Sequence, residues 1–297
     1  MAQTKLSWQS KLILLAIVPF AGTEVALAIR GTEAASAPVS TACWIFGLSC
    51  LLGLLTWRLR AATPAASATG AVITASLLFS TASFPFKPWH TALIPIVLVS
   101  LLAYAATIVG RRQKERLGTA EARRGRTASQ VAANLGMAAM AASAPVQIWL
   151  ADSGLVRGTL APLPIVSLAL AAMAEAAADT VSSEIGQVLG GKPRLITTGH
   201  VVEPGRNGAV SLAGTAAGMA AAAIVAGSGC WALGGGWSLF AIGTAGGIFG
   251  LFFDSLLGAT VEDRGWLNND AVNFLSTASA AGFALLLLAL IPHPGVG

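Results

Sequence analysis

Long apolar runs alternate with short polar stretches along the chain. The apolar runs lie at about 11–29, 37–57, 68–83, 91–110, 128–150, 160–181, 208–232, 237–259 and 271–291. Most of them approach or exceed the roughly 20 residues that an apolar α-helix needs to cross a bilayer. A membrane β-barrel would instead show short strands with period-two alternation. The pattern therefore predicts an all-α, polytopic membrane protein with about nine transmembrane helices.

The composition strengthens this interpretation. Of the 297 residues, 55% are hydrophobic and 10% are charged, whereas a soluble domain has about 25% charged residues. The three cysteines, Cys43, Cys50 and Cys230, lie in apolar stretches without metal or redox spacing. The three histidines are scattered, so we expect no histidine-based metal site.

Basic residues predict the orientation of the helices in the membrane. The stretch 110–126 contains two glutamates and seven basic residues: Arg111, Arg112, Lys114, Arg116, Arg123, Arg124 and Arg126. Because cytoplasmic loops carry an excess of Lys and Arg, this loop and the N-terminus are predicted to be cytoplasmic and the C-terminus external. The first apolar run has no convincing signal-peptide cleavage site after it, and no long Arg- and Ser-rich leader precedes it. We therefore expect a multi-pass protein of the cytoplasmic (inner) membrane of a prokaryote.

Five predicted helix ends carry polar side chains, and the orientation places all five at the cytoplasmic boundary. Two predicted helices end there, in "ADTVSSEIG" and "FFDSLLGAT". Three begin there, in "GRTASQVAAN", "EPGRNGAVSLAGT" and "NNDAVNFLS". The sequence thus predicts one polar site that several helices share.

Carboxylates in this set suggest a divalent cation. Asp179 and Asp254 are flanked by apolar or small residues, and a charge at the bilayer centre costs roughly 2.5–3.5 kcal/mol on insertion scales. Glu175 lies one turn from Asp179 on the same helix face, so these two groups repel unless a proton or a cation lies between them. Oxygen ligands suit Mg²⁺, and further oxygen ligands are available from Asn269, Asp270 and Asn273. The alternatives are ion pairs with Arg or Lys that hold helices together and, for Glu184 and Asp270, ordinary solvation at the interface.

Glycine and basic residues at the same face suggest phosphate binding. Gly205 and Gly208 bracket Arg206 and Asn207 at the predicted start of a helix, where free backbone N–H groups and the helix dipole favour an anion. "GRT" at 125–127 repeats the arrangement at another helix start. Together with an apolar interior that could receive a lipid tail, these features favour phosphoryl or nucleotidyl transfer to a lipid phosphate.

Five motifs resemble a known family in the expected order. They are "KERLGTAEARRGRTASQVAAN", "ADTVSSEIG", "PRLITTGHVVEPGRNGAVSLAGT", "DSLLGAT" and "NNDAVNFLST". Together they resemble the integral membrane family that includes phytyl-phosphate kinase of the tocopherol pathway. The resemblance covers roughly 68–290, so 1–67 is interpreted as a variable N-terminal pair of transmembrane helices before a family core at 68–297. Val181 and Ser182 depart from the family, which often has an aromatic residue after "ADT".

The resemblance implies a Mg²⁺-dependent phosphotransferase, a prenyl-phosphate kinase. It would transfer a phosphoryl group from a nucleoside triphosphate, expected to be CTP, to an isoprenyl monophosphate such as phytyl phosphate. The partners are then a nucleotide, a prenyl lipid and membrane lipids, with no nucleic acid; the sequence leaves open the oligomeric state.

Roles for individual residues follow from the resemblance as hypotheses. Asp179, Glu184 and Asp254 would be catalytic and hold Mg²⁺. Glu175, Asp270 and Asn273 complete the candidate metal ligands. The candidate substrate- and nucleotide-binding residues are Arg126, Asn134, Thr180, Ser183, Lys192, Arg194, Gly205, Arg206, Asn207, Gly208, Ser211 and Asn269.

A transporter or lipid flippase is the alternative function, with intramembrane carboxylates acting as proton or cation relays. Transporter sites usually lie near the bilayer midplane between inverted repeats. No inverted repeat is evident here, and the polar groups cluster at one face, which favours an enzyme. A scaffold that only packs helices would leave the carboxylates unexplained.

Overall fold

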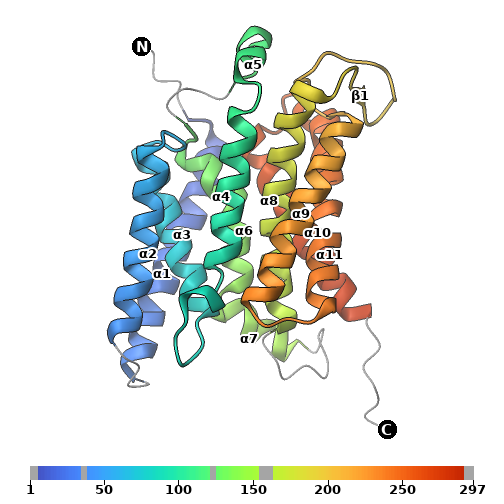
Figure 1. The fold of residues 1–297 in the computed structure, drawn as a ribbon. Coiled ribbons are helices and arrows are strands. Elements are labelled where there is room, and N and C mark those ends of the chain that lie inside the picture. Colours follow the sequence, from blue (N-terminus) through green and yellow to red (C-terminus); the bar gives the residue numbers. More distant parts are fainter. Residues whose placement is uncertain (1–5, 35–38, 121–124, 154–162, 291–297) are drawn as a thin grey trace.

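The protein is a bundle of long helices that run side by side (Figure 1). The computed structural model describes residues 6–34, 39–120, 125–153 and 163–290. The N-terminal helices are α1 (Trp8–Ala34), α2 (Val39–Arg58), α3 (Pro64–Thr81), the 3₁₀ turn η1 (Pro88–His90), α4 (Leu93–Ile108), α5 (Arg111–Leu117), α6 (Ala128–Ala142) and α7 (Ala144–Asp152). The C-terminal elements are α8 (Leu163–Leu189), β1 (Arg194–Leu195), β2 (Ala209–Val210), α9 (Leu212–Ala232), α10 (Trp237–Leu257), the π-helical turn η2 (Gly258–Glu262) and α11 (Asn269–Leu290).

The prediction of an all-α membrane protein is confirmed. Six described helices are long and apolar enough to cross a membrane: α1, α2, α3, α9, α10 together with η2, and α11. The number rises to eight if the bent pairs α4–α5 and α6–α7 each count as one span. Each predicted apolar run coincides with a helix or a bent pair, and α8 runs alongside the others (Figure 1). The count of nine transmembrane helices remains a prediction.

Both bends occur where the sequence interrupts a helix. The chain bends by 66° between α4 and α5, where Gly110 adopts a left-handed conformation. It bends by 52° between α6 and α7 at Ser143, two residues before Pro145. Proline at the start of α7 cannot donate the hydrogen bond that would continue α6.

Helix α8 is the centre of the bundle. Its residues 166–178 are buried without interruption, and α4, α6, α9, α10 and α11 all pack against it. A helix that is apolar on every side is buried on every side. Glycines on its neighbours allow this close approach: a Cβ at Gly247 of α10 would lie 2.8 Å from the Cβ of Ala174.

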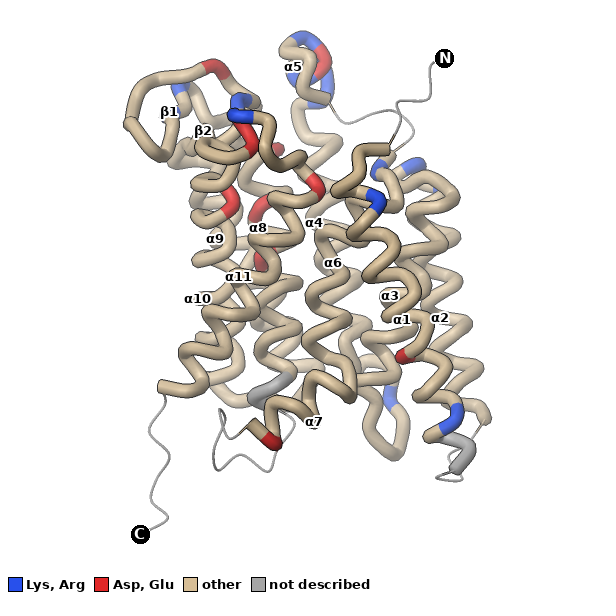
Figure 2. Tube along the Cα trace, turned by 180° about the vertical axis from the view of Figure 1, so that it is seen from behind, with Lys and Arg blue, Asp and Glu red and all other residues tan. Residues whose placement is uncertain are grey.

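Charged residues gather at one end of the bundle. Figure 2 shows most Lys and Arg segments at the end that carries α5 and the loop with β1 and β2. The predicted cytoplasmic loops meet there, since Gln9 of α1 donates a 2.8 Å hydrogen bond to the carbonyl of Trp266 and Arg206 lies 3.2 Å from Asp263. The opposite end carries few charges. This arrangement agrees with the predicted orientation, and the basic residues Arg123 and Arg124 lie outside the described residues.

One predicted boundary is wrong in a way that affects the site. The apolar run at 208–232 was expected to begin a helix at Gly208, but α9 begins at Leu212, after Ser211 caps it by accepting a 3.1 Å hydrogen bond from the N–H of Gly214. Gly208 has a φ of +71°, which a right-handed helix excludes. Gly205, Arg206, Asn207 and Gly208 therefore lie in a loop and not at a helix N-terminus.

Candidate functional site

A polar cavity of about 260 Å³ lies at the charged end of the bundle. The ends of α6, α8, α10 and α11 form its walls, and the loop before α9 closes it. All five polar stretches that the sequence predicted to converge therefore do so, four of them as helix ends and the fifth as the loop before α9. Of the predicted site residues, those that line the cavity are Arg126, Asn134, Asp179, Thr180, Ser183, Glu184, Gly205, Arg206, Asn207, Gly208, Ser211, Asp254, Asn269 and Asn273.

Asp179 and Asp254 form the acidic centre of the cavity. Asp179 extends from α8 and Asp254 from α10, and both side chains line the same cavity. Asp254 Oδ1 is buried and has no hydrogen-bond partner among the described residues. Two carboxylates that share one small cavity repel each other, and a proton or a cation between them relieves that repulsion. The pair is therefore a place where a cation would lower the energy of the protein.

Glu175 lies one turn deeper on α8 and does not line the cavity. It is 1% exposed, and within the described part of the chain neither of its carboxylate oxygens has a hydrogen-bond partner. Its side chain packs against Gly250 of α10, where any Cβ would collide with it. A missing side chain on α10 thus makes room for this carboxyl group behind the Asp179–Asp254 pair.

Glu184 lines the cavity wall, but its carboxylate is already engaged. Lys114 Nζ lies 2.5 Å from Glu184 Oε2, and Thr107 Oγ1 donates a 3.2 Å hydrogen bond to Oε1. Lys114 is completely buried and also donates to the carbonyl of Ala106 at 2.8 Å. The structure thus gives Glu184 an ion-pair partner, which was the alternative considered for the carboxylates.

Arg126 is held at the cavity by backbone contacts with the turn between α2 and α3. Its N–H donates to the carbonyl of Ala61 at 2.9 Å, and its carbonyl accepts from the N–H of Thr63 at 3.0 Å. Gly125 makes this approach possible, because it has a φ of +79° and a Cβ there would collide with the backbone of Ala61. The guanidinium group then reaches Thr180 on α8, with Nη2 3.3 Å from the hydroxyl oxygen.

The loop before α9 closes the cavity through an equally tight contact. Gly208, with a φ of +71°, packs on the π-helical turn η2, where a Cβ would lie 2.6 Å from the Cα of Ala259. The neighbouring Arg206 pairs with the exposed Asp263 at 3.2 Å. Surface pairs of this kind contribute about 0–1 kcal/mol, so the pairing leaves the guanidinium group of Arg206 able to contact a ligand.

Asparagine side chains from α6 and α11 complete the wall of the cavity. Asn269 and Asn273 share one face of α11, as predicted, and both line the cavity. The amide of Asn273 donates to Asn134 Oδ1 at 3.4 Å, and Asn134 in turn donates to the carbonyl of Gln130 at 2.8 Å. This chain of amides fixes the orientation of both side chains.

Three other predicted site residues lie away from the cavity. Lys192 and Arg194 are exposed, and the Arg194 guanidinium donates to the carbonyl of Gly199 at 2.8 Å. Asp270 faces α1 and accepts a 2.5 Å hydrogen bond from Ser10. Neighbouring positions on a helix point about 100° apart, so Asp270 cannot share the face of Asn269 and Asn273.

Two residues important to the site were not predicted. Lys114 belongs to a basic stretch that was expected to be a solvated loop. Glu262 lines the cavity eight positions after Asp254, although an uninterrupted α-helix would rotate it by about 80° from that residue. The wider π-helical turn η2 absorbs this rotation, and neither hydrophobic periodicity nor charge indicates such a turn.

The oxygen donors of the cavity suit Mg²⁺, and they do not form a complete metal site made of protein ligands alone. Among the described residues, no three His, Cys, Asp or Glu side chains are arranged as a ready-made metal site. Mg²⁺ typically uses one or two carboxylates and completes its shell with water and substrate phosphates. The carboxyl groups of Asp179 and Asp254 line the same cavity, and Asp254 Oδ1 has no hydrogen-bond partner among the described residues, which matches that requirement.

Comparisons with known proteins agree with a membrane protein of this kind. A sequence model described as "Integral membrane protein DUF92" matches residues 47–281. An uncharacterised membrane protein of Methanocaldococcus jannaschii is 45% identical over 108 residues, which cover 36% of this chain and 45% of that protein. An uncharacterised membrane protein of Synechocystis is 30% identical over 259 residues, which cover 77% of this chain and 93% of that protein.

A plant relative is also found. The chloroplastic protein VTE6 of Arabidopsis thaliana is 32% identical over 190 residues, covering 63% of this chain and 55% of that protein. The chain thus spans about half the length of two of these three relatives and nearly all of the third. No solved structure matches the chain.

Proposed function

The chain belongs to the integral membrane protein family DUF92, and on that premise we propose that it is a prenyl-phosphate kinase. It would transfer the terminal phosphoryl group of a nucleoside triphosphate, CTP in our proposal, to an isoprenyl monophosphate. Family membership, predicted from the motifs, is confirmed by the match over 47–281. The kinase proposal is supported by the motifs, which resemble the family that includes phytyl-phosphate kinase, and the similarity to the plant protein VTE6 agrees with that family.

The observation that carries the proposal is the composition of one small cavity. Two carboxyl groups, those of Asp179 and Asp254, share it with Arg126, with the glycine-containing loop around Arg206 and with the amide of Asn273. Phosphoryl transfer needs little covalent chemistry from the protein and depends on positioning and charge neutralisation. A cavity with acids for a cation and arginines for phosphates provides both.

Asp179 and Asp254 would hold Mg²⁺, with Glu262 and Asn273 as additional oxygen donors. Bound there, Mg²⁺ would neutralise charge on the transferred phosphoryl group and on the nucleoside diphosphate that leaves. Glu184 is left out of the proposed ligands because Lys114 already balances its charge.

The remaining residues position the two phosphates. Arg126, braced by Thr180, would bind the acceptor monophosphate, and Arg206 with the backbone of Asn207 and Gly208 would bind the nucleotide phosphates. An oxygen of the acceptor phosphate forms the new P–O bond while the bond between the γ-phosphorus and its bridging oxygen breaks. The products are a nucleoside diphosphate and an isoprenyl diphosphate. The attacking oxygen is already anionic near neutral pH, so no general base is required.

The location of the cavity also supports an enzyme over a transporter. Transporter sites usually lie near the bilayer midplane. Here the cavity opens among helix ends at the charged end of the bundle (Figure 2), where a soluble nucleotide has access if that end is cytoplasmic. We propose that this end faces the cytoplasm of a prokaryote and that the protein resides in the inner membrane.

The test uses the purified full-length protein in detergent with CTP, Mg²⁺ and phytyl, farnesyl or geranylgeranyl monophosphate. We expect formation of the corresponding diphosphate together with CDP, loss of turnover with EDTA and recovery with added Mg²⁺. Replacement of CTP by other nucleotides identifies the donor. Movement of prenyl phosphate across proteoliposomes without nucleotide, and no diphosphate under any condition, would support the flippase and contradict the kinase.

A further inference from the structure

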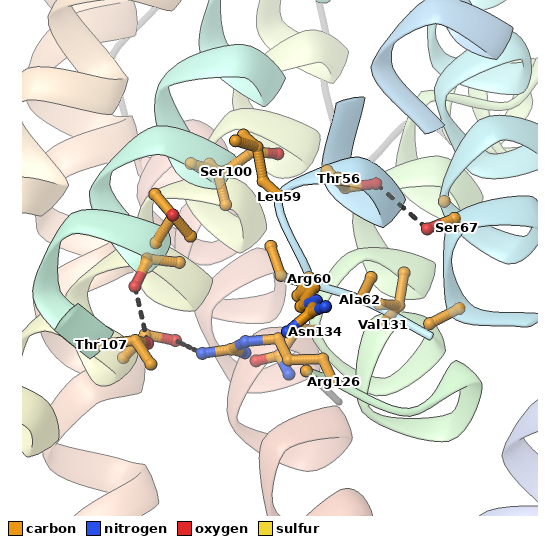
Figure 3. Close-up of a pocket in the computed structure, with 18 of the residues that line it drawn as sticks. Thr56, Leu59, Arg60, Ala62, Ser67, Ser100, Thr107, Arg126, Val131 and Asn134 are labelled. Atoms are coloured by element: carbon orange, nitrogen blue, oxygen red, sulfur yellow. Dashed lines mark hydrogen bonds between the residues drawn. The ribbon is translucent and has the colours of Figure 1, made fainter. Parts of the chain in front are cut away.

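A second and larger cavity adjoins the polar cavity. It has a volume of about 660 Å³ and is lined by residues of α2, α3, α4, α6 and α8; Figure 3 shows part of this lining. This volume falls within the range of roughly 300–1,000 Å³ that is typical of small-molecule sites. Arg126, Asn134 and Thr180 line both cavities. We refer to it as the apolar cavity.

Several hydroxyl groups in the walls of the apolar cavity are engaged by the protein itself. The hydroxyl of Ser100 donates to the carbonyl of Ile96 at 2.9 Å, and the hydroxyl of Thr56 donates to the carbonyl of Gly53 at 2.9 Å. Thr56 and Ser67 also lie 3.2 Å apart, as the dashed line in Figure 3 shows. Because these hydroxyls are satisfied by the protein itself, the surface that remains suits a hydrocarbon.

One end of the apolar cavity is strongly basic. Arg60 and Arg126 approach each other there (Figure 3), and Arg112 also contributes to the lining. Arg60 has a φ of +55° and is the non-glycine residue with positive φ in the described chain. The left-handed conformation costs a residue with a side chain about 1–2 kcal/mol, and such strain tends to persist at functional positions. The strained backbone at Arg60 ends α2 and presents this guanidinium at the cavity mouth.

We propose that the apolar cavity binds the hydrocarbon chain of a single-chain isoprenyl monophosphate, with its phosphate at Arg60 and Arg126. This inference rests on the proposed function and assigns the acceptor subsite. A ligand with one anionic head and one apolar tail matches a cavity that is basic at one end and apolar along its length. Arg126 then presents the head group directly to the Asp179–Asp254 pair in the polar cavity.

The depth of the apolar cavity limits the length of the hydrocarbon chain that it can hold. Its lining on α4 extends from Ile108 near the basic end to Ile96, a distance of roughly 18 Å at 1.5 Å per residue. Gly70 lies partway down on α3, and a Cβ there would meet only Val131 Cγ1, at 3.7 Å. A larger side chain at Gly70 would therefore grow into the cavity and shorten the space for the tail.

The test compares Gly70→Leu with Gly47→Leu. Gly47 lies on α2 and is exposed, and a Cβ there would meet nothing within 4 Å, so it controls for the same change in a helix outside the cavity. Both substitutions favour the helix, because leucine has a higher helix propensity than glycine. Binding of geranylgeranyl monophosphate and of isopentenyl monophosphate to the full-length protein in detergent is measured by calorimetry, with CTP binding as a separate titration.

We expect Gly70→Leu to weaken geranylgeranyl monophosphate binding by about tenfold or more, since an overfilled cavity cannot accept the chain. The short isopentenyl compound and CTP should bind as they do to the wild type, and Gly47→Leu should change none of the three. Equal binding of the long-chain compound to Gly70→Leu and wild type overturns the inference. So does binding of the two-chain lipid phosphatidic acid with equal sensitivity to Gly70→Leu.

Turnover measured on the same variants separates the two proposals. Loss of long-chain binding in Gly70→Leu without any turnover in the wild type supports the subsite and contradicts the kinase. Turnover in the wild type that Gly70→Leu leaves unchanged for every chain length supports the kinase and contradicts the subsite.

Discussion

Lys114 Nζ on α5 lies 2.5 Å from Glu184 Oε2 on α8, and both residues are buried. The lysine also binds the carbonyls of Ala106 and Thr107 at the end of α4. One ammonium group thus closes the bend between α4 and α5 and connects it to the helix that carries Asp179. Glu184 lines the polar cavity, and Thr107, which also binds it, lines the apolar cavity.

The first prediction is that Lys114→Met destabilises the protein. Removal of one partner leaves an uncompensated buried charge, which costs about 3–5 kcal/mol. Thermal unfolding in detergent should show a much lower midpoint for Lys114→Met than for Arg116→Met, whose side chain is exposed on the same short helix. The double variant Lys114→Met with Glu184→Gln should recover part of the loss. Equal unfolding midpoints for Lys114→Met and Arg116→Met would show that the Lys114–Glu184 pair does not stabilise the fold.

The second prediction concerns the acidic pair. Asp254→Asn or Asp179→Asn should lower turnover by about 100-fold or more, as expected when a group that stabilises transition-state charge is removed. The fold should persist, since the amide is isosteric with the carboxyl group. Glu203→Gln, an exposed acid outside the polar cavity, is the matched control. Steady-state rates at saturating Mg²⁺ and the unfolding midpoint are measured together, and full activity in both Asp variants would exclude the proposed metal site.

The third prediction separates binding from chemistry at Arg126. Arg126→Met should raise the KM for the prenyl monophosphate by about 10- to 100-fold, because a hydrogen bond to a charged group contributes about 1.5–3 kcal/mol. The KM for CTP should change less, and Arg126→Lys should recover part of the loss. Arg116→Met serves again as a control. An increase confined to the KM for CTP would assign Arg126 to the nucleotide and not to the acceptor.

The fourth prediction uses two glycines with the same backbone angle. Gly208 and Gly199 both have a φ of +71°, but a Cβ at Gly199 meets nothing within 4 Å whereas a Cβ at Gly208 meets Ala259. Both alanine variants incur the left-handed strain of about 1–2 kcal/mol. Only Gly208→Ala should also displace the loop from η2 and reduce turnover. Unfolding midpoints and CTP binding test this, and identical behaviour of the two variants would mean that the loop contact does not shape the cavity.

Much of the architecture was predictable because it depends on local properties of the chain. The length of each apolar run determines whether a helix can cross a bilayer, and the excess of Lys and Arg marks the ends that meet at one side. Asn269 and Asn273 were expected on one face of a helix, and they do share it. The convergence of five polar helix ends followed from counting helices, without knowledge of how they pack.

The errors at the site have a common cause. The side chain of Asp270 was grouped with Asn269 and Asn273, but its direction on α11 places it against Ser10 of α1. Glu184 was grouped with Asp179, and packing gave it a lysine partner from a stretch interpreted as a solvated loop. In both cases the sequence identified an acidic residue near the site, but it did not indicate the direction in which the side chain points.

The sequence by itself determined the fold class, the polar end of the bundle and the acids and arginines that would meet there, because hydrophobicity and charge act residue by residue. Only the tertiary structure decided which of those side chains face the cavity, that a π-helical turn adds Glu262 to it, and that an apolar cavity begins at Arg126. Those features depend on the rotation of each helix and on contacts between distant segments, and packing against neighbours sets both.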